Sequence, residues 1–264
     1  MKKFQGFVKN FVQVATLLVT GSILAASPSQ AATFASSNGA LEFTNFSQSP
    51  LNVGTGTNVN TLAQGGIVQA QATAQAFFVI NPPVAFNLSL TEAIGQGRDY
   101  LGLAESEARV IGDFVVEAST SFAFDFTAAL DLNTFIENPP AENARAAGDI
   151  SFVLFDRTNQ NVLDFFSLTG NLTTEGDNDF IALQKSDNVA FNVLAQDSQF
   201  GGNFEFANAL VQGSLERFFA NKTDLTLIEV KTNKAQVQAP EPSTTLALFL
   251  GCGVVGIAAV RRKK

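Results

Sequence analysis

Polar and apolar residues alternate along much of this chain. The segment from Gly66 to Ile80 reads as a strand, because its residues 69–76 alternate between polar residues and Ala, which places a polar row on one face and a small apolar row on the other. The polar row consists of Gln69, Gln71, Thr73 and Gln75. Asn81-Pro82-Pro83 interrupts the alternation, which then resumes as far as Leu90. This pattern predicts a long hairpin with a proline-containing turn.

The same period of two recurs further along the chain. From Asp113 to Leu132 it places Phe122, Phe124 and Phe126 on one face. Shorter strand candidates are Leu41–Phe46, Ile150–Asp156, Val162–Leu168, Phe180–Leu183, Val189–Leu194, Phe204–Ala207, Leu215–Phe219 and Leu225–Thr232. Many short strands separated by Gly, Pro and Asn predict an all-β fold, an antiparallel β-sandwich with a jelly-roll-like arrangement.

Two segments depart from this pattern. Gln48 to Gly66 is polar and rich in Gly, which predicts a loop or a ragged edge. Apolar residues between Thr91 and Gly112 recur at helix-like spacings, which predicts one short helix near Ala104.

The N-terminus has the three parts of a secretory signal peptide. Lys2, Lys3 and Lys9 precede an apolar run from Phe11 to Ala26, and small residues follow at Ser29 and Ala31. This order predicts cleavage after Ala31 or Ala32, so residues 1–31 are excluded from the fold. An uncleaved N-terminal anchor is the weaker alternative, because the small residues are so well placed.

The C-terminus, residues 239–264, also has three parts in a fixed order. Pro240-Glu241-Pro242 cannot continue a helix or a central strand, so it should stay extended and accessible. The next 17 apolar residues, Thr244 to Val260, would form a helix about 26 Å long, just enough to span a bilayer core of about 30 Å. Arg261, Arg262, Lys263 and Lys264 would hold that end in the cytoplasm.

This tail closely resembles the PEP-CTERM sorting signal of bacterial exported proteins. The resemblance implies recognition by an exosortase, a membrane-embedded cysteine transpeptidase, and processing near the Pro240-Glu241-Pro242 motif. It implies an exported protein, at the cell surface or secreted, with a transient stage in the inner membrane. The resemblance covers about the last tenth of the chain, and an ordinary C-terminal membrane anchor is the alternative.

The body between these ends, residues 32–238, is acidic. It holds nine of the 16 Lys and Arg residues and 23 of the 24 Asp and Glu residues, which gives a net charge near −14. That charge disfavours nucleic-acid binding, which needs clustered Lys and Arg. The single Cys252 lies in the C-terminal apolar run, so the body has no disulfide and its stability must come from packing and hydrogen bonds.

Composition argues against catalysis. The chain has no His, which excludes Ser-His-Asp and Cys-His constellations and imidazole ligands for zinc. A pair of catalytic carboxylates is compatible with the composition but cannot be located, and one Tyr without Trp gives little aromatic surface for sugars. The 26 Phe residues fall mostly at strand-periodic positions, as core residues do.

One acidic segment could bind a cation. Glu175, Asp177 and Asp179 surround Gly176 and Asn178 and could offer oxygen ligands to Ca²⁺. An acidic hairpin turn is the favoured interpretation, because Asp, Asn and Gly occupy turns for backbone reasons alone.

These observations predict a non-enzymatic protein of the cell surface or extracellular matrix. The tail resemblance implies a link to exopolysaccharide or to the biofilm matrix. The alternative is a carbohydrate- or calcium-binding jelly-roll module, in which the Gln69 row would form the binding face rather than a solvated outer face.

Overall fold

A computed structural model describes residues 32–174 and 178–239, and this part of the chain is built from antiparallel β-strands without a helix. No helix in these two ranges is therefore long and apolar enough to cross a membrane. The strands are β1 (Ala32–Thr44), β2 (Asn52–Ile80), β3 (Pro83–Val116), β4 (Thr120–Ile136), β5 (Asn143–Asp156), β6 (Asn161–Thr173), β7 (Phe180–Lys185), β8 (Val189–Gln199), β9 (Phe204–Phe219) and β10 (Thr223–Ala239).

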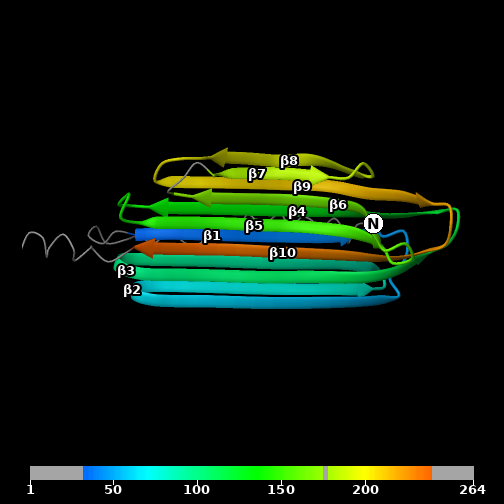
Figure 1. Ribbon diagram of the computed structural model, residues 1–264, viewed down its shortest axis with the longest axis horizontal. Coiled ribbons are helices and arrows are strands. Elements are labelled where there is room, and N and C mark those ends of the chain that lie inside the picture. Colours follow the sequence, from blue (N-terminus) through cyan, green and yellow to red (C-terminus); the bar gives the residue numbers. More distant parts are fainter. Residues whose placement is uncertain (1–31, 175–177, 240–264) are drawn as a thin grey trace, which may run out of the picture. The chain divides into compact units, whose positions relative to one another are not determined.

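The strands form one continuous sheet in the order β7-β6-β5-β10-β3-β1-β4-β9-β8, with β2 paired to β3 (Figure 1). β3 belongs to both halves of this sheet. Its residues 85–96 pair with β1, whereas its residues 100–116 pair with β10. β2 follows the whole length of β3 as the other arm of a long hairpin.

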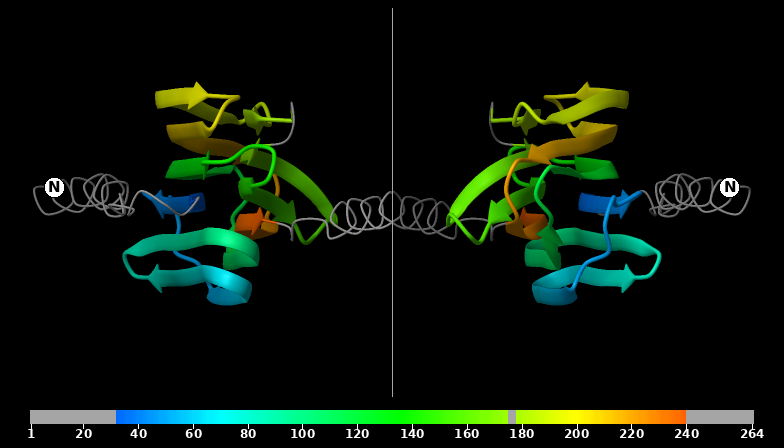
Figure 2. Two further views of the ribbon diagram at one scale, coloured as in Figure 1. Left: turned by 90° about the vertical axis from the view of Figure 1, so that its left-hand side faces the viewer. Right: turned by 90° about the vertical axis from the view of Figure 1, so that its right-hand side faces the viewer.

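The hairpin of β2 and β3 bends where β3 changes partners. The bend combines a register shift at Gly65 and Gly66 of β2 with positive φ angles at Gly65, Gly66, Gly97 and Asp99. At Gly65 a Cβ atom would lie 2.1 Å from the carbonyl oxygen of Asp99, so only glycine fits there. The bend turns the sheet over on itself into two facing layers, as the end views show (Figure 2).

We call these the β1 layer and the β10 layer. The β1 layer holds β8, β9, β4 and β1 with residues 83–96 of β3, and the β10 layer holds β7, β6, β5 and β10 with residues 100–116 of β3. The inward side chains of the two layers meet in the core.

Phenylalanine rings from both layers interlock in the larger part of this core. Phe152 of β5 lies 5.4 Å from Phe43 of β1 and 5.2 Å from Phe126 of β4, measured between ring centroids. Phe166 of β6 lies 4.8 Å from Phe126. Each such buried ring removes a large apolar area from water and adds edge-to-face contacts, so these rings are the main source of stability.

The expectation of an all-β antiparallel fold is confirmed. The two layers, however, belong to one nearly closed, barrel-like sheet rather than to the separate sheets of a jelly-roll. The difference arises at the bent hairpin, because a strand as long as β3 can pair in both layers.

The prediction of a helix near Ala104 is wrong, because residues 100–116 are a continuous part of β3. The inward positions around Ala104 are occupied by small residues, namely Gly102, Ala104, Ser106 and Ala108. Small inward residues let the layers approach closely, but they also hide the apolar–polar alternation that reveals a strand.

Of the two alternatives for Gln48 to Gly66, the loop is wrong for most of its length, since β2 begins at Asn52 and forms an exposed edge strand there. This part of β2 pairs with residues 100–113 of β3 and is largely exposed. It lacks an apolar row because it covers little of the core, so nothing in its hydropathy marks it as a strand.

Candidate functional site

Most of the site residues predicted from sequence lie outside the described residues. This holds for Ser29 and Ala31 at the signal cleavage site, for Glu175 and Asp177, and for the sorting residues Pro240, Glu241, Pro242, Arg261, Arg262, Lys263 and Lys264. Ala32 is the first residue of β1.

Asp179 is the described member of the acidic segment. Its Oδ1 accepts a hydrogen bond of 2.8 Å from the Thr173 backbone N–H, which is a turn-stabilising contact. Burial raises the pKa of the nearby Glu205 carboxyl, hydrogen bonds from Thr134 and Gly201 lower it, and Asp179 raises it further. Within the described ranges no three acidic side chains gather into a cation site.

A cluster absent from the sequence-based prediction lies in the middle of the core. Asn87 of β3 faces inward from the β1 layer, and Glu229 and Lys231 of β10 face it from the opposite layer. Asn87 Nδ2 donates a hydrogen bond to Glu229 Oε2, and Lys231 Nζ donates one of 2.5 Å to Asn87 Oδ1. Glu229 and Lys231 are 0% exposed and Asn87 is 1% exposed. We call these three residues the interior cluster.

Strand periodicity explains how charged residues reach the core. The inward row of β10 runs through Leu225, Leu227, Glu229, Lys231, Asn233, Ala235 and Val237. Three polar residues therefore occupy an otherwise apolar row. That interruption is the signal by which the cluster could have been noticed in the sequence, because charged residues seldom point into a core without a partner.

Further polar contacts extend the cluster between the layers. Ser89 and Ser106, from the two halves of β3, form a hydrogen bond across the core. Asn233 Nδ2 donates to Ser37 Oγ at 2.6 Å, and Ser37 Oγ donates to the Ala147 carbonyl oxygen at 2.7 Å. Hydroxyl and amide groups thus cross the core directly between the two apolar clusters.

The charge states of the interior cluster are set by its burial. Burial raises the pKa of Glu229 to about 8, against the opposing effects of Lys231 and Asn87. Burial lowers the pKa of Lys231 to about 7, although Glu229 opposes this. In the described part of the chain no carboxylate oxygen lies within 4.0 Å of Lys231 Nζ. The amine and the carboxyl are therefore neutral together more readily than they are ionised together.

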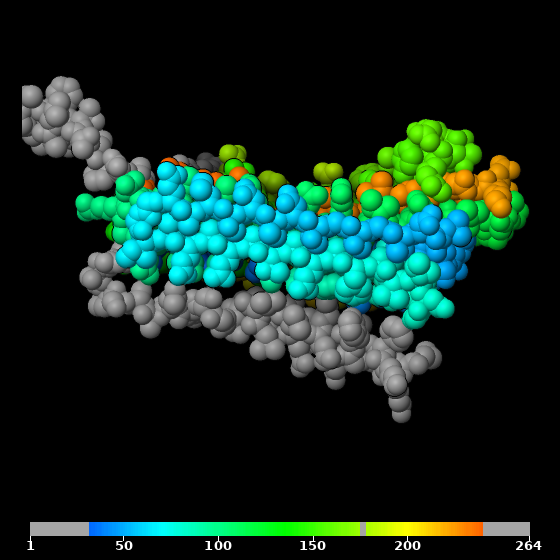
Figure 3. Space-filling model, turned by 90° about the horizontal axis from the view of Figure 1, so that it is seen from below, coloured from blue at the N-terminus to red at the C-terminus, as the bar shows by residue number. Residues whose placement is uncertain are grey.

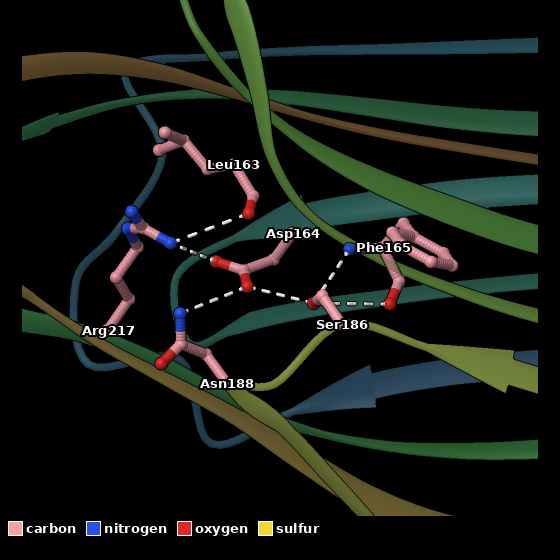
Figure 4. Close-up of polar contacts among 6 residues, drawn as sticks. All are labelled: Leu163, Asp164, Phe165, Ser186, Asn188 and Arg217. Atoms are coloured by element: carbon pink, nitrogen blue, oxygen red, sulfur yellow. Dashed lines mark hydrogen bonds and ion pairs between the residues drawn. The ribbon is translucent and has the colours of Figure 1, made fainter.

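A second set of polar side chains joins the two layers where β6 faces β9. Asp164 of β6 is buried, and its Oδ2 lies 3.0 Å from Arg217 Nη1 of β9 (Figure 4). Its Oδ1 accepts hydrogen bonds from Ser186 Oγ at 2.8 Å and from Asn188 Nδ2 at 3.1 Å. Arg217 also donates to the Leu163 carbonyl oxygen. Both oxygens of the Asp164 carboxylate are therefore engaged. We interpret these residues as a structural link between the layers and call them the clip.

An open depression of about 440 Å³, lined mainly by polar residues, lies on the outer surface of the β10 layer. Asn60, Glu105, Asp149 and Lys234 are among the residues that line it. Glu105 is already engaged there, since it pairs with Lys234 at 3.0 Å and accepts from Asn60 at 3.2 Å. No aromatic ring lines this depression, so it lacks the stacking surface typical of sugar sites.

The β2 strand forms an uncharged edge. Among the described strands β2 pairs only with β3, and it covers much of the face seen in Figure 3. The chain has no charged residue from Phe43 to Thr91. The polar row of Gln69, Gln71, Thr73 and Gln75 points outward and is exposed, while the Ala row points inward.

Comparison with known proteins identifies no relative of this chain. No family model, no curated protein and no solved structure matches this chain. Functional inference therefore rests on the residues themselves.

Proposed function

We propose that this is a non-enzymatic exported protein of the cell surface or extracellular matrix, sorted through its C-terminal tail. The observation that carries the proposal is the order of the tail, in which Pro240-Glu241-Pro242 precedes an apolar run and four basic residues. The N-terminal signal pattern ending at Ser29 and Ala31 supports the same route.

The processing partner would be an exosortase-type enzyme, and the apolar run would hold the chain in the inner membrane until processing. The body would then act outside the cell, where extracellular polysaccharide is the expected partner. Two properties of the body support a structural role. Its most unusual polar groups are sealed inside the core, and its outer depression offers polar side chains already engaged with one another.

The mass and cellular location of the mature protein in its own host test this proposal. We expect a product that begins near Ala32, ends near the Pro240-Glu241-Pro242 motif and lies outside the inner membrane. Replacing the three motif residues with Ala should retain the tail and the membrane location. The matched control is Ser243→Ala/Thr244→Ala beside the motif, which should be processed normally. A wild-type product that still carries Arg261 to Lys264 in the inner membrane would contradict the proposal.

A carbohydrate- or calcium-binding module is the second candidate. It is favoured by the outward polar row of β2, which could contact a glycan, and by the acidic composition of residues 175–179. A glycan array tests the first ligand class, with Gln69→Ala/Gln71→Ala as the variant that should lose binding. Calorimetry with Ca²⁺, on the wild type and on Asp177→Ala/Asp179→Ala, tests the second. Wild-type heat no larger than that of dilution would exclude calcium binding.

A further inference from the structure

We infer that Lys231 and Asn87 react with each other to form an intramolecular amide bond, with Glu229 as the group that moves the protons. The reaction would join Lys231 Nζ to Asn87 Cγ and would cross-link the β10 layer to the β1 layer. This inference goes beyond the proposed function, and it does not depend on how the chain is sorted.

Geometry places the amine against the carbon it would attack. Lys231 Nζ lies 2.5 Å from Asn87 Oδ1. Because a carbonyl oxygen is bonded to its carbon at about 1.2 Å, Nζ lies no more than about 3.7 Å from Cγ. Reacting atoms held in near-attack positions are typically about 3–3.5 Å apart. The fold therefore holds a nucleophile and an electrophile close to reactive separation.

The surroundings keep the amine in its reactive form. A lysine is nucleophilic only when neutral, and desolvation in an apolar pocket is one way to activate it. Lys231 lies between Ala108 and Ile150 in the strand registers, and Glu229 lies between Val110 and Phe152. These apolar neighbours exclude water, and the lowered pKa of Lys231 is the consequence.

Glu229 is placed to give a proton to the nitrogen that leaves. Its Oε2 contacts Asn87 Nδ2, the nitrogen that must leave. Its Oε1 has no hydrogen-bond partner among the described residues. No carboxylate oxygen of the described residues lies within 4.0 Å of Nζ, so Nζ must move from Oδ1 towards Cγ and Glu229 before this oxygen can take its proton. A protonated carboxyl can thus donate through one oxygen while the other receives, as a general acid and base does.

The atoms balance without any further reactant. The lone pair of neutral Nζ attacks Cγ, and the new N–C bond forms. Glu229 gives its proton to Nδ2. It takes one from Nζ after the new bond has drawn that nitrogen towards the carboxyl, so Glu229 ends the reaction protonated as it began. The Cγ–Nδ2 bond breaks, ammonia leaves, and Oδ1 remains a carbonyl oxygen. No oxidant or reductant is needed, and the chain loses one molecule of ammonia.

Such a bond would supply what the chain lacks. The body has no Cys and hence no disulfide. Asn87 and Lys231 are 144 residues apart in sequence, so the bond would close a loop spanning most of the body. Closing a long loop reduces the conformational freedom of the unfolded chain and so favours the folded state. A surface-exposed β-protein would gain resistance to unfolding that no reducing agent could remove.

Mass spectrometry of the purified full-length protein tests the inference. We expect the intact mass to be lower by one ammonia than the mass of the sequence between the observed termini. Trypsin should fail to cut after Lys231, because that side chain is acylated. The peptide Thr223 to Lys234 should then appear joined to the peptide that ends at Arg98. Separate, unmodified peptides from correctly folded protein would overturn the inference.

Variants separate the roles of the three residues. Lys231→Met and Asn87→Ala should abolish the linked peptide. Glu229→Gln should retain the shape of the side chain but leave the two peptides unlinked, and linkage in this variant would overturn the role of Glu229. The matched control is Lys234→Met, at a partly exposed lysine of the same strand, which should remain fully linked. The wild-type result decides the bond itself even if a variant fails to fold.

Discussion

At the residue scale, the space for the interior cluster depends on Gly39 of β1. A Cβ atom at this position would lie 2.8 Å from Lys231 Cδ and 2.9 Å from Asn233 Oδ1, closer than real side chains come. Both of those groups are buried and enclosed, so neither can move aside easily. A larger residue at position 39 should therefore push the lysine stem away from Asn87.

The first prediction is that Gly39→Ala destabilises the body by about 1–3 kcal/mol, the usual cost of overpacking a core. It should also reduce the fraction of linked Lys231. Chemical denaturation and peptide mapping measure the two effects. Gly54→Ala is the control, because a Cβ there would make an ordinary contact of 3.7 Å with Ile111 Cβ. Equal behaviour of the two variants would contradict the packing argument.

The second prediction concerns pH and uses Lys231→Met, in which the cross-link cannot form. Glu229 then loses the charged partner that lowers its pKa, while burial and, to a smaller extent, Asp149 still raise that pKa well above 4.5. The unfolded chain ionises near 4.5 while the folded chain keeps the proton. Stability should therefore be highest below pH 4.5 and should fall as pH rises towards 8, by up to about 1.4 kcal/mol per pH unit.

Denaturant titrations at several pH values measure this dependence. The double variant Lys231→Met/Glu229→Gln is the control, because it removes the titrating group and should lose that part of the slope. If the stability of Lys231→Met does not change between pH 5 and pH 8, burial does not hold Glu229 in its neutral form.

At the element scale, two features join the β1 layer to the β10 layer. One is the long hairpin of β2 and β3, and the other is the clip that Asp164 and Arg217 form between β6 and β9. The third prediction is that Asp164→Ala destabilises the body by about 2–3 kcal/mol, since Arg217, Ser186 and Asn188 all lose their shared acceptor. Thermal or chemical denaturation measures the loss. Lys222→Ala, which breaks an exposed pair with Glu117, should leave the unfolding midpoint unchanged.

The elements that sequence predicts well are those with a strong apolar row. The strand β4 points Phe122, Phe124 and Phe126 into the core, as their alternation indicates. Residues 100–112 and the first half of β2 do not read as strands, for opposite reasons. The former has inward residues too small to register as an apolar row, and the latter covers so little of the core that it needs none.

At the scale of the whole molecule, the fold brings together residues that no local pattern connects. Asn87 ends up against Lys231 only because β3 bends into both layers and β10 returns between β3 and β5. Polar residues in the inward row of β10 could have suggested a buried cluster. Which residue of the opposite layer faces these polar residues could not have been predicted, because it depends on how the two layers are positioned against each other.

The sorting residues show the reverse situation. Their pattern is local and can be recognised from sequence, whereas Pro240 to Lys264 lie outside the described residues. The proposed export route therefore rests on sequence, and the proposed cross-link rests on the three-dimensional arrangement of the body. Each can fail without the other, since one concerns the termini and the other concerns the core.

Electron density from a crystal of the mature wild-type protein gives the most direct test of the interior of this sheet. We predict continuous density from Lys231 Nζ to Asn87 Cγ, with a planar amide in place of the two separate side chains and no Nδ2 atom. Separate side chains, with an intact Asn87 amide hydrogen-bonded to a free lysine, would contradict the cross-link. The interior cluster would then be a buried polar network that joins the layers only by hydrogen bonds.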